Sequence, residues 1–329
     1  MKRAAQETPL TFALLRLLAD GAFHSGQTMA AQLGTSRASV HNALREVGMY
    51  GLDLHRVRGR GYRLAHPLHW LDEALIKQQL DAGTVVRLEI VEHTSSTNAM
   101  LLQRAVLGAA SGSVLAAEWQ SAGRGRLGRA WQAGLGDALT FSLLWRFDGG
   151  LGGLSGLSLA VGVAVLRALD EIGVREAGLK WPNDVLLGAG KLAGILLEAQ
   201  GDMLGPSAVV IGVGLNLRVP ATARAVIDQP VSDLVTAGVA AEARSRVFGI
   251  LLKHLLRVME EFSARGFAAL REEWEAHHAF RQREVKLSLP DGTSMVGWVC
   301  GVTDEGALRV QTATGERVFH AGEISLRGM

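Results

Sequence analysis

The chain has 329 residues, a net charge of +2 and 20% charged residues, and this length and composition predict two or three globular domains. Its single cysteine, Cys300, excludes an intramolecular disulfide, and no cysteine–histidine cluster in the sequence suggests a metal site. We expect Cys300 to pack as a small apolar residue in a strand, with a functional thiol as the alternative.

The N-terminal segment Met1–Thr8 carries charges but lacks the apolar region of a secretory signal. No uninterrupted apolar run in the sequence approaches the length that crosses a bilayer. We therefore expect a cytoplasmic protein without a membrane partner.

Charge is distributed unevenly along the chain. Residues 1–66 hold nine lysines and arginines against four acidic residues, whereas the remainder holds 25 basic and 28 acidic residues. A small basic module is thus joined to a slightly acidic body, which favours nucleic-acid binding by the N-terminal module alone.

Apolar spacing in the basic module predicts a winged helix-turn-helix. Helices are expected over Leu10–Leu18, Thr28–Leu33 and Arg37–Val47, with residues 34–36 supplying the turn and the cap of the third helix. Two strands, Leu52–Val57 and Tyr62–Leu64, would enclose a tight basic wing at residues 58–61.

The polar side of the third helix and the wing supply the candidate DNA-binding residues. Because the apolar positions of this helix face inward, its polar positions are left to face a DNA groove. The candidates are Ser36, Arg37, Ser39, His41, Arg58 and Arg60. A protein-interaction domain with a solvated basic loop is the alternative.

A break at His66-Pro67 separates the module from the body, and one amphipathic helix is expected over His69–Leu80. The body then alternates strands with helices, which predicts an α/β domain. Strands are expected over residues 85–92, 114–119, 138–145 and 209–217, and helices near 97–107, 156–172, 246–264 and 267–279. From Glu284 onward, short strands separated by turns predict a small β-barrel.

Residues 123–129, Gly-Arg-Gly-Arg-Leu-Gly-Arg, are the most distinctive motif of the body. Glycines let the backbone close on a ligand, and each guanidinium offers a planar fork of donors to oxygen anions. The motif suits a polyphosphate or an acyl phosphate, although a solvated linker or a general nucleic-acid patch has a similar composition.

Three further segments of the body carry candidate site residues. Leu179–Asp184 and Gly190–Glu198 predict two short strands around a turn, flanked by two lysines and an aspartate. Val209–Leu217 predicts a buried strand whose glycines allow a ligand to lie against the backbone. Ser95–Asn98 precedes a helical pattern, and one of these polar residues is expected to cap that helix.

These motifs resemble the biotin–protein ligases, specifically the bifunctional form that also represses biotin-synthesis genes. The resemblance spans nearly the whole chain. Its matching segments are Ser96–Asn98, Gln120, Gly123–Arg129, Lys180–Asp184, Lys191–Leu196, Gly212–Asn216 and Gly322–Arg327.

The resemblance implies a multi-domain α+β protein with three parts. Residues 1–66 would form a winged helix-turn-helix DNA-binding domain. Residues 67–280 would form a mixed-sheet α/β catalytic domain similar to the class II aminoacyl-tRNA synthetases, and residues 281–329 an SH3-like barrel.

The resemblance also implies a reaction. Biotin would be activated with ATP to biotinyl-5′-AMP and passed to a lysine of a biotin carboxyl carrier protein, with Mg²⁺ bridging phosphate oxygens and no metal ligand from the chain. The biotin carboxylate and the α-phosphate are both anions, so positive charge fixed in advance favours their reaction. On the family's pattern this catalytic role falls to Lys191, Arg124 and Arg126.

The remaining site residues fall into two groups by the same resemblance. Hydroxyls and amides suit the ureido group of biotin because they both donate and accept hydrogen bonds. The biotin-binding group is Ser96, Thr97, Asn98, Gln120, Arg124, Gly125, Arg126, Lys191, Gly194 and Leu196. The nucleotide-binding group is Arg126, Arg129, Trp131, Asn183, Asp184 and Asn216, with packing alone as the alternative for Trp131.

Other positions are assigned more loosely. Trp181 and Pro182 are expected to be scaffold, and Asp184 to orient the site lysines. Glu323 and Arg327 either reach toward the nucleotide or acceptor or form a salt bridge at a domain seam. Two residues depart from the family's pattern, Leu127 where an arginine and Gln132 where an aromatic residue is common, so we expect weaker retention of the adenylate.

Two other functions stay open: a ligand-sensing regulator without ligase activity, and a lipoate ligase. Intact Lys191 and Arg126 argue against the first, and the polar set around Gln120 argues against the second. One recognition helix reads too little sequence for a unique genomic site, so we expect a homodimer on operator DNA, favoured when ligand orders residues 123–129.

Overall fold

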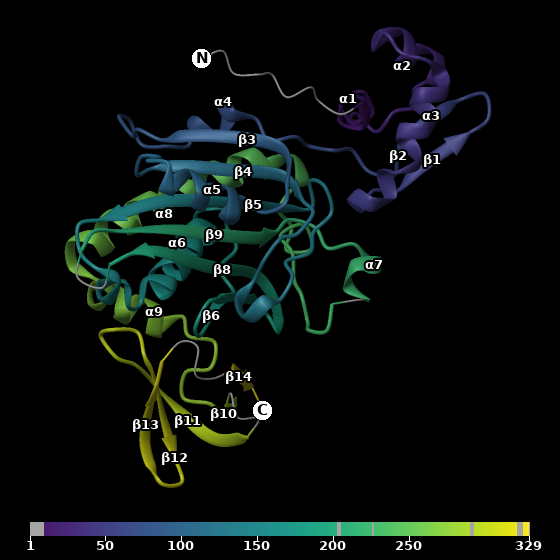
Figure 1. Ribbon diagram of the computed structural model, residues 1–329. Coiled ribbons are helices and arrows are strands. Elements are labelled where there is room, and N and C mark those ends of the chain that lie inside the picture. The colour runs from purple at the N-terminus through teal and green to yellow at the C-terminus, as the bar shows by residue number, and fades with distance from the viewer. Residues whose placement is uncertain (1–9, 203–204, 226, 290–292, 321–324, 329) are drawn as a thin grey trace.

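The computed structural model describes residues 10–202, 205–225, 227–289, 293–320 and 325–328. Its elements form three groups, in chain order a helical module, a body built on one large sheet, and a small C-terminal sheet. Figure 1 shows the helical module and the C-terminal sheet at separate ends of the body. Glu323 lies outside the described residues, and only the backbone of Arg327 is described.

The N-terminal module is a winged helix-turn-helix, as the sequence predicts. Ser36 begins the third helix by accepting a hydrogen bond from the Ser39 N–H at 3.0 Å. That helix ends earlier than expected, and the buried Val47 instead starts a 3₁₀ turn. The elements are α1 (Leu10–Leu17), α2 (Gly26–Gln32), α3 (Arg37–Arg45), η1 (Val47–Tyr50), β1 (Leu54–Val57) and β2 (Gly61–Leu64).

The wing is supported by a third extended segment that the sequence does not predict. His24 and Tyr62 form an antiparallel bridge, in which each backbone N–H donates to the other residue's carbonyl at 2.9 Å. A side chain at Gly61 would overlap the carbonyl of His24, and Gly61 has a φ of 104°. This close approach therefore requires glycine at the base of the wing.

A seven-stranded sheet organises the body, with strand order β3-β4-β5-β9-β8-β7-β6. The β3–β4 pair is parallel, and the other neighbouring pairs are antiparallel. The strands are β3 (Arg87–Thr94), β4 (Ser113–Gln120), β5 (Ala138–Phe147), β6 (Ala177–Lys180), β7 (Asp184–Leu187), β8 (Gly190–Gly201) and β9 (Ser207–Asn216). The segment 179–198, expected to hold two strands, thus contains parts of three.

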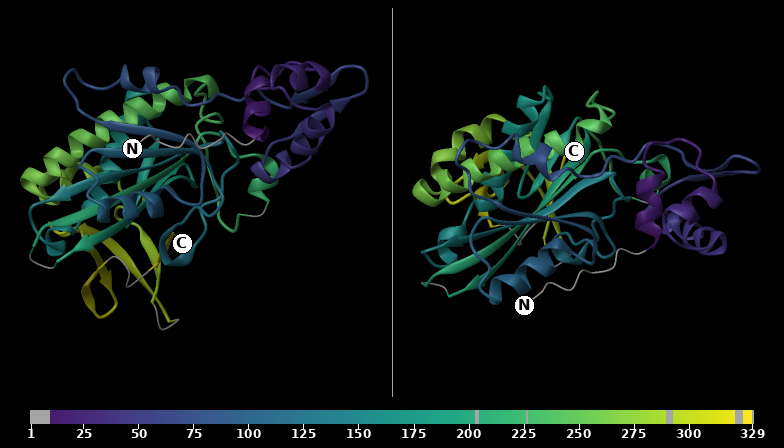
Figure 2. Two further views of the ribbon diagram at one scale, coloured as in Figure 1. Left: turned by 45° about the horizontal axis from the view of Figure 1, so that its top comes forward. Right: turned by 90° about the horizontal axis from the view of Figure 1, so that it is seen from above.

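Helices cover both faces of this sheet (Figures 1 and 2). Helices α6 (Leu157–Glu171) and α8 (Arg244–Arg265) pack on one face and α5 (Thr97–Val106) on the other. Successive side chains of β5 point to opposite faces of the sheet, so Leu143 packs in the core under α6 and Leu144 in the core under α5. The remaining helical pieces are η2 (Arg126–Gly128), η3 (Leu151–Leu154), α7 (Ala221–Arg224) and η4 (Ala241–Ala243).

The helix expected over His69–Leu80 is wrong at its N-terminal end, because α4 covers only Glu73–Lys77. The preceding backbone bonds to the body instead. The Leu71 N–H donates to Glu118 Oε1 at 2.7 Å, and the Asp72 N–H donates to Ser245 Oγ at 2.9 Å. These tertiary bonds hold residues 69–72 outside the helix.

The helix expected over residues 267–279 is also shorter. It divides into η5 (Phe267–Leu270) and α9 (Arg271–Ala276). The next residues extend the edge of the large sheet, because Leu179 N–H donates to His277 O at 2.8 Å and Ala279 N–H donates to Leu179 O at 2.9 Å. Pairing with β6 thus ends the helix.

One stretch, Leu151–Glu171, is long and apolar enough to span a membrane by length and composition alone. A break at Gly156, with φ of 77°, separates η3 from the 15-residue α6. A helix of that length covers about 22 Å, short of a hydrocarbon core of about 30 Å. Because α6 is packed between the sheet and α8, it reads as a core helix.

The C-terminal group is a five-stranded antiparallel sheet with order β13-β12-β11-β10-β14. Its strands are β10 (Glu284–Ser288), β11 (Ser294–Val302), β12 (Leu308–Thr312), β13 (Gly315–Phe319) and β14 (Ser325–Gly328). The expectation that Cys300 is packed away is wrong, because its side chain is exposed. Val299 and Gly301 take the buried positions of β11, and alternation leaves Cys300 on the outer face with Trp298.

Candidate active site

The Gly/Arg segment folds into a closed loop at the end of β4. Arg124 and Ala130 form an antiparallel bridge, and the Trp131 N–H donates to Gly123 O at 2.9 Å. Within the loop, the Gly125 N–H donates to Arg129 O at 2.7 Å. The hairpin brings its two ends together and fixes where the arginines leave the backbone.

Two arginines of this loop reach partners on other segments of the body, one in the turn before β7 and one on β8. Arg126 Nη1 donates to Asn183 Oδ1 at 3.1 Å, and Arg124 lies 3.4 Å from Glu198 Oε1. Burial lowers the pKa of Arg126, the Asp184 charge opposes this shift, and Arg129 adds to it. Guanidinium remains charged at neutral pH in spite of such a shift, so the loop carries partly desolvated positive charge.

Lys191, near the start of β8, lies beside the same carboxylate. Its ammonium is 2.6 Å from Asp184 Oδ1, and both side chains are more than four-fifths buried. The charge of Asp184 therefore acts on both Lys191 and Arg126. A carboxylate at this distance fixes the direction of the lysine side chain.

Glycines open a floor between β8 and β9 at this position. Gly194 and Gly214 pair across the two strands. A Cβ at Gly214 would overlap the indole of Trp131, and one at Gly194 would lie 3.0 Å from Lys191 Cε and 3.4 Å from the indole. The absence of a side chain at Gly214 lets Trp131 lie against the sheet backbone, and Gly194 leaves room for the Lys191 side chain beside it.

A buried polar cluster lies next to this floor. Ser96 caps α5, and the Thr97 N–H donates to Gln120 Oε1 at 2.7 Å. Asn98 donates through Nδ2 to Glu198 Oε2 at 2.8 Å and accepts at Oδ1 from Ser142 Oγ at 2.5 Å. Thr97, Asn98 and Gln120 are thus gathered into one hydrogen-bonded group through Ser142, and Ser96 lies beside it as the cap of α5.

Ser142 and Glu198 belong to this cluster although the sequence did not assign them to it. Ser142 is a fully buried polar residue between the apolar Phe141 and Leu143 of β5, which is the signal that could have identified it. Glu198 was visible as an acid at the end of a predicted strand. Its proximity to both Asn98 and Arg124 depends on the position of β8 in the sheet.

Two predicted site residues use their polar atoms within the protein. Asn216 Nδ2 donates to Lys191 O at 3.2 Å and Ser232 O at 3.0 Å. Asn183 Nδ2 donates to Ile195 O at 2.9 Å while its oxygen accepts from Arg126. Both amides therefore position the strands and side chains of the site.

The scaffold expected at Trp181 is present. Its indole is buried, and Nε1 donates to Gly306 O at 3.0 Å, which ties the body to the C-terminal sheet. Three other predicted residues are less enclosed: Arg124 is nearly half exposed, and Arg129 and Leu127 are exposed. Leu127 has a positive φ of 54°, an uncommon conformation for a residue with a side chain.

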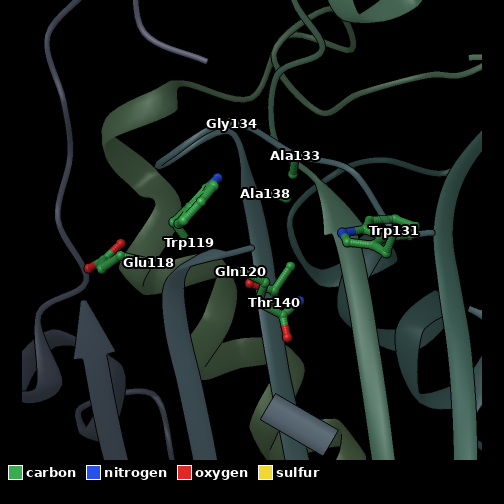
Figure 3. Close-up of a pocket in the computed structure, with 8 residues that line it drawn as sticks. All are labelled: Glu118, Trp119, Gln120, Trp131, Ala133, Gly134, Ala138 and Thr140. Carbon is green, nitrogen blue, oxygen red and sulfur yellow. The ribbon is translucent and has the colours of Figure 1, made fainter. Parts of the chain in front are cut away.

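A small pocket lies between the polar cluster and the loop (Figure 3). It is lined by Glu118, Trp119, Gln120, Trp131, Ala133, Gly134, Ala138 and Thr140. Figure 3 shows the side chains of Gln120 and Thr140 between the indoles of Trp119 and Trp131. Its volume of about 10 Å³ is close to that of one water-sized probe, so a larger ligand needs the loop or Trp131 to move.

The chain after the loop enters the N-terminal module. Leu135 is buried in the core of that module, and its N–H donates to Tyr50 O at 2.7 Å. The Tyr50 ring packs edge-on against Trp119, with centroids 4.8 Å apart. The pocket and the helix-turn-helix therefore share a wall.

The predicted DNA-binding residues divide by exposure. Arg37, Arg58 and Arg60 are exposed. Ser36 and Ser39 are joined by hydrogen bonds at the start of α3. His41 is only partly exposed, and its Nδ1 lies 3.2 Å from the hydroxyl of Tyr62.

Known families match all three parts of the chain. Residues 10–63 match an HTH domain, residues 90–216 the biotin/lipoate A/B protein ligase family, and residues 283–327 the biotin protein ligase C-terminal domain. The bifunctional ligase/repressor BirA of Salmonella typhimurium is 35% identical over 98% of this chain and 99% of its own length. The protein of the same name from Escherichia coli is 36% identical over 95% and 96%.

This chain belongs to the bifunctional biotin ligase/repressor family. Among solved structures, the biotin protein ligase from Aquifex aeolicus in complex with biotin and ATP has a TM-score of 0.63 and 28% identity, covering 74% of this chain and 99% of that one. Ligase and repressor parts are thus joined in one polypeptide. The described residues include no group of three or more histidine, cysteine or acidic side chains that could hold a metal ion.

Proposed function

We propose that the cluster around Lys191 joins biotin to ATP and then to a carrier lysine. The observation that supports this proposal is the convergence of Lys191, Arg126 and Arg124 beside a glycine floor, with the charge of Asp184 acting on the first two cations. Cations held in place before reaction lower the energy of a state in which two anions approach. This arrangement therefore suits carboxylate attack on a phosphate.

The reaction has two steps. In the first, a carboxylate oxygen of biotin bonds to the α-phosphorus of ATP, and pyrophosphate leaves with the electrons of the broken P–O bond. In the second, the carrier lysine amine bonds to the acyl carbon, loses a proton, and displaces AMP. Lys191 would contact the carboxylate and α-phosphate in the first step, while Arg124 and Arg126 would neutralise the oxygens around them.

The polar cluster would hold the ureido end of biotin. Thr97, Asn98 and Gln120 already bond to one another or to nearby strands, and Ser96 caps α5, so ligand binding exchanges some of these bonds. Gly125, Gly194 and Leu196 would line the chain of the ligand. Arg129, Trp131, Asn183, Asp184 and Asn216 would border the nucleotide.

Mg²⁺ would enter as Mg-ATP. The carboxylates beside the cations are Asp184 and Glu198, and each is paired with a lysine or an arginine. The side chains of the site therefore do not fit a protein-built cage for the ion. We propose that phosphate oxygens and water would be the ligands of the ion. No side chain of this protein would coordinate it directly.

The N-terminal module would bind operator DNA as a homodimer when the site holds the adenylate. Arg37, Arg58 and Arg60 are exposed on α3 and the wing, which suits contacts with bases or phosphates. Ordering of residues 123–129 by ligand would support the dimer. Sedimentation with and without biotin and Mg-ATP tests this idea, and an unchanged monomer fraction contradicts it.

We infer that the protein is cytoplasmic and that its acceptor is a biotin carboxyl carrier domain. We also infer three domains, at residues 1–66, 67–280 and 281–329. No helix or strand of the described residues crosses these limits, because β2 ends at Leu64 and β10 begins at Glu284. Expression of residues 67–329 as a separate fragment tests the first limit. Retention of a cooperative unfolding transition is the expected result.

The deciding experiment measures pyrophosphate release and acceptor labelling with Mg-ATP and either biotin or lipoate. We expect activity with biotin and its loss in Lys191→Ala. The matched control is Lys253→Ala. Lys253 lies on α8, and its ammonium is 2.7 Å from Glu171 at the end of α6. Activity with lipoate alone, or equal loss in both variants, contradicts the proposal.

A further inference from the structure

Arg224, at the end of α7, ties together both ends of a segment beside the site. Its Nε donates to Val219 O at 3.1 Å and its Nη1 to Val231 O at 2.7 Å. Its Nη2 forms an ion pair with Asp233, whose side chain is only 2% exposed. The three nitrogens of this guanidinium thus bond to three different residues, Val219, Val231 and Asp233.

Asp233 completes this closure from the other side. Its Oδ2 accepts from the Val219 N–H at 3.2 Å, and its Oδ1 accepts from the Thr236 N–H at 2.7 Å. A buried carboxylate with these partners needs the arginine, because an unpaired buried charge is costly. Arg224 and Asp233 therefore hold the described parts of residues 219–236 in one conformation.

The same segment forms hydrogen bonds with the backbone of Lys191. The Lys191 N–H donates to Pro230 O at 2.9 Å, and Lys191 O accepts from the Ser232 N–H at 3.0 Å. Ser232 Oγ also donates to Leu187 O at 2.7 Å, across the turn between β7 and β8. Gly190 faces Ser232 so closely that a Cβ there would overlap its hydroxyl.

We propose that Arg224 is a positioning residue for adenylate formation. Its bonds to Val219, Val231 and Asp233 hold the described part of residues 219–233 beside the start of β8. We call this set of bonds the clip. It fixes the backbone from which the Lys191 side chain extends toward Asp184. Lysine would be a poor substitute, because one ammonium cannot hold two carbonyls and a carboxylate in the geometry of a planar fork. The inference rests on the proposed role of Lys191.

Single-turnover adenylate formation measures this role directly. Arg224→Gln is expected to lower the rate about tenfold or more, since small errors in the placement of a reacting group are costly. The KM for biotin is expected to rise by a much smaller factor than the rate falls, because the polar cluster at the ureido end bonds to Ser142 and Glu198 and not through the clip. Arg224→Lys is expected to recover part of the rate.

A matched control is available on α8. Arg257 also pairs with an aspartate through two nitrogens, at 2.7 and 2.5 Å from Asp81, and it is half exposed. Arg257→Gln is expected to leave the rate within about twofold of the unaltered protein. An Arg224→Gln rate within that range, or a rate loss matched by an equal rise in KM, overturns the clip.

Two further outcomes keep the test decisive. If Arg224→Gln unfolds below the assay temperature, Arg224→Lys decides, and a rate equal to that of the unaltered protein overturns the proposal. If the unaltered protein forms no adenylate from biotin, the proposed function fails. If the unaltered protein is active and both Arg224 variants match it, only the clip fails.

Discussion

Two segments of this chain are alike in composition and differ in structure: the wing at residues 58–61 and the loop at residues 123–129 alternate glycine with arginine. In the wing, Arg60 lies 4.2 Å and Arg63 4.8 Å from the centroid of the Phe23 ring. In the loop, the arginines meet the side chains of Asn183 and Glu198.

The difference follows from what each segment adjoins. The wing extends from a two-stranded hairpin into solvent, where an aromatic ring steadies arginines without neutralising them. The loop at residues 123–129 follows the carboxyl end of β4, where Asn183, just before β7, and Glu198 on β8 lie close to its arginines. Similar Gly/Arg sequences thus give a solvent-facing cationic surface in one place and partly desolvated cations in the other.

The largest effect is expected from Arg126→Ala. Loss of a partly buried cation at the reacting anions should lower kcat/KM for adenylate formation by about 100-fold. DNA affinity of the ligand-free protein should be unchanged, as measured by fluorescence anisotropy. Arg175→Ala is the control, because this arginine is 80% exposed and pairs with Asp170 outside the site, and an equal loss there would mean that the position of Arg126 beside the site does not explain the effect.

A second test changes the glycine floor. Gly214→Ala should lower the rate of adenylate formation about tenfold, because a new methyl group overlaps the indole of Trp131 and displaces it. Gly152→Ala is the control, since nothing lies within 4 Å of its added Cβ. Stopped-flow tryptophan fluorescence and turnover report the change, and an unaltered rate would show that Trp131 can shift without consequence.

In the wing, Arg60→Ala should weaken DNA binding by a smaller factor. Loss of one phosphate contact is expected to reduce the slope of log K against log salt by about 0.9. Ligase activity should stay within about twofold, because Arg60 contacts Phe23 and not the site. Phe23→Leu tests the aromatic support. A drop in ligase activity with either variant contradicts the separation of the two loops.

The smallest effect on activity is expected at Asp137, which lines a pocket with residues of both the N-terminal module and the body, and the change there is measured as stability. Burial raises the pKa of Asp137 to about 6, against the opposing charges of Arg218 and Arg244. Because the folded state holds this proton more tightly than the unfolded state, its contribution to stability is lost as pH rises from about 4 to about 6. Asp137→Asn should remove about 3 kcal/mol of that pH dependence in chemical denaturation.

A matched experiment uses the opposite shift elsewhere. Burial lowers the pKa of His278 to about 4, so the folded state resists protonation and loses stability as pH falls from about 6.5 toward 4. His278→Phe should weaken that acid sensitivity. Identical pH profiles for the two variants would contradict the assignment of opposite shifts to Asp137 and His278.

Local patterns predicted much of the fold. The cap at Ser36, the polar start of α5 and the buried strand β9 depend on neighbours within a few residues, and each is confirmed. The helix over His69–Leu80 failed because Glu118 and Ser245, distant in sequence, take up its backbone N–H groups. Cys300 was misplaced because the alternation of β11, not its polarity, decides its face.

The sequence by itself determined the three kinds of unit, the family and the pairing of a basic DNA-binding module with a Gly/Arg-loop ligase. These follow from short-range periodicity and from residues that stand close together in the chain. Only the tertiary structure brought Ser142 and Glu198 to Asn98, and Arg224 to Asp233 and, through its segment, to Lys191. Sheet order and loop closure make those contacts, because strands and loops far apart in the sequence become neighbours only when the sheet is assembled.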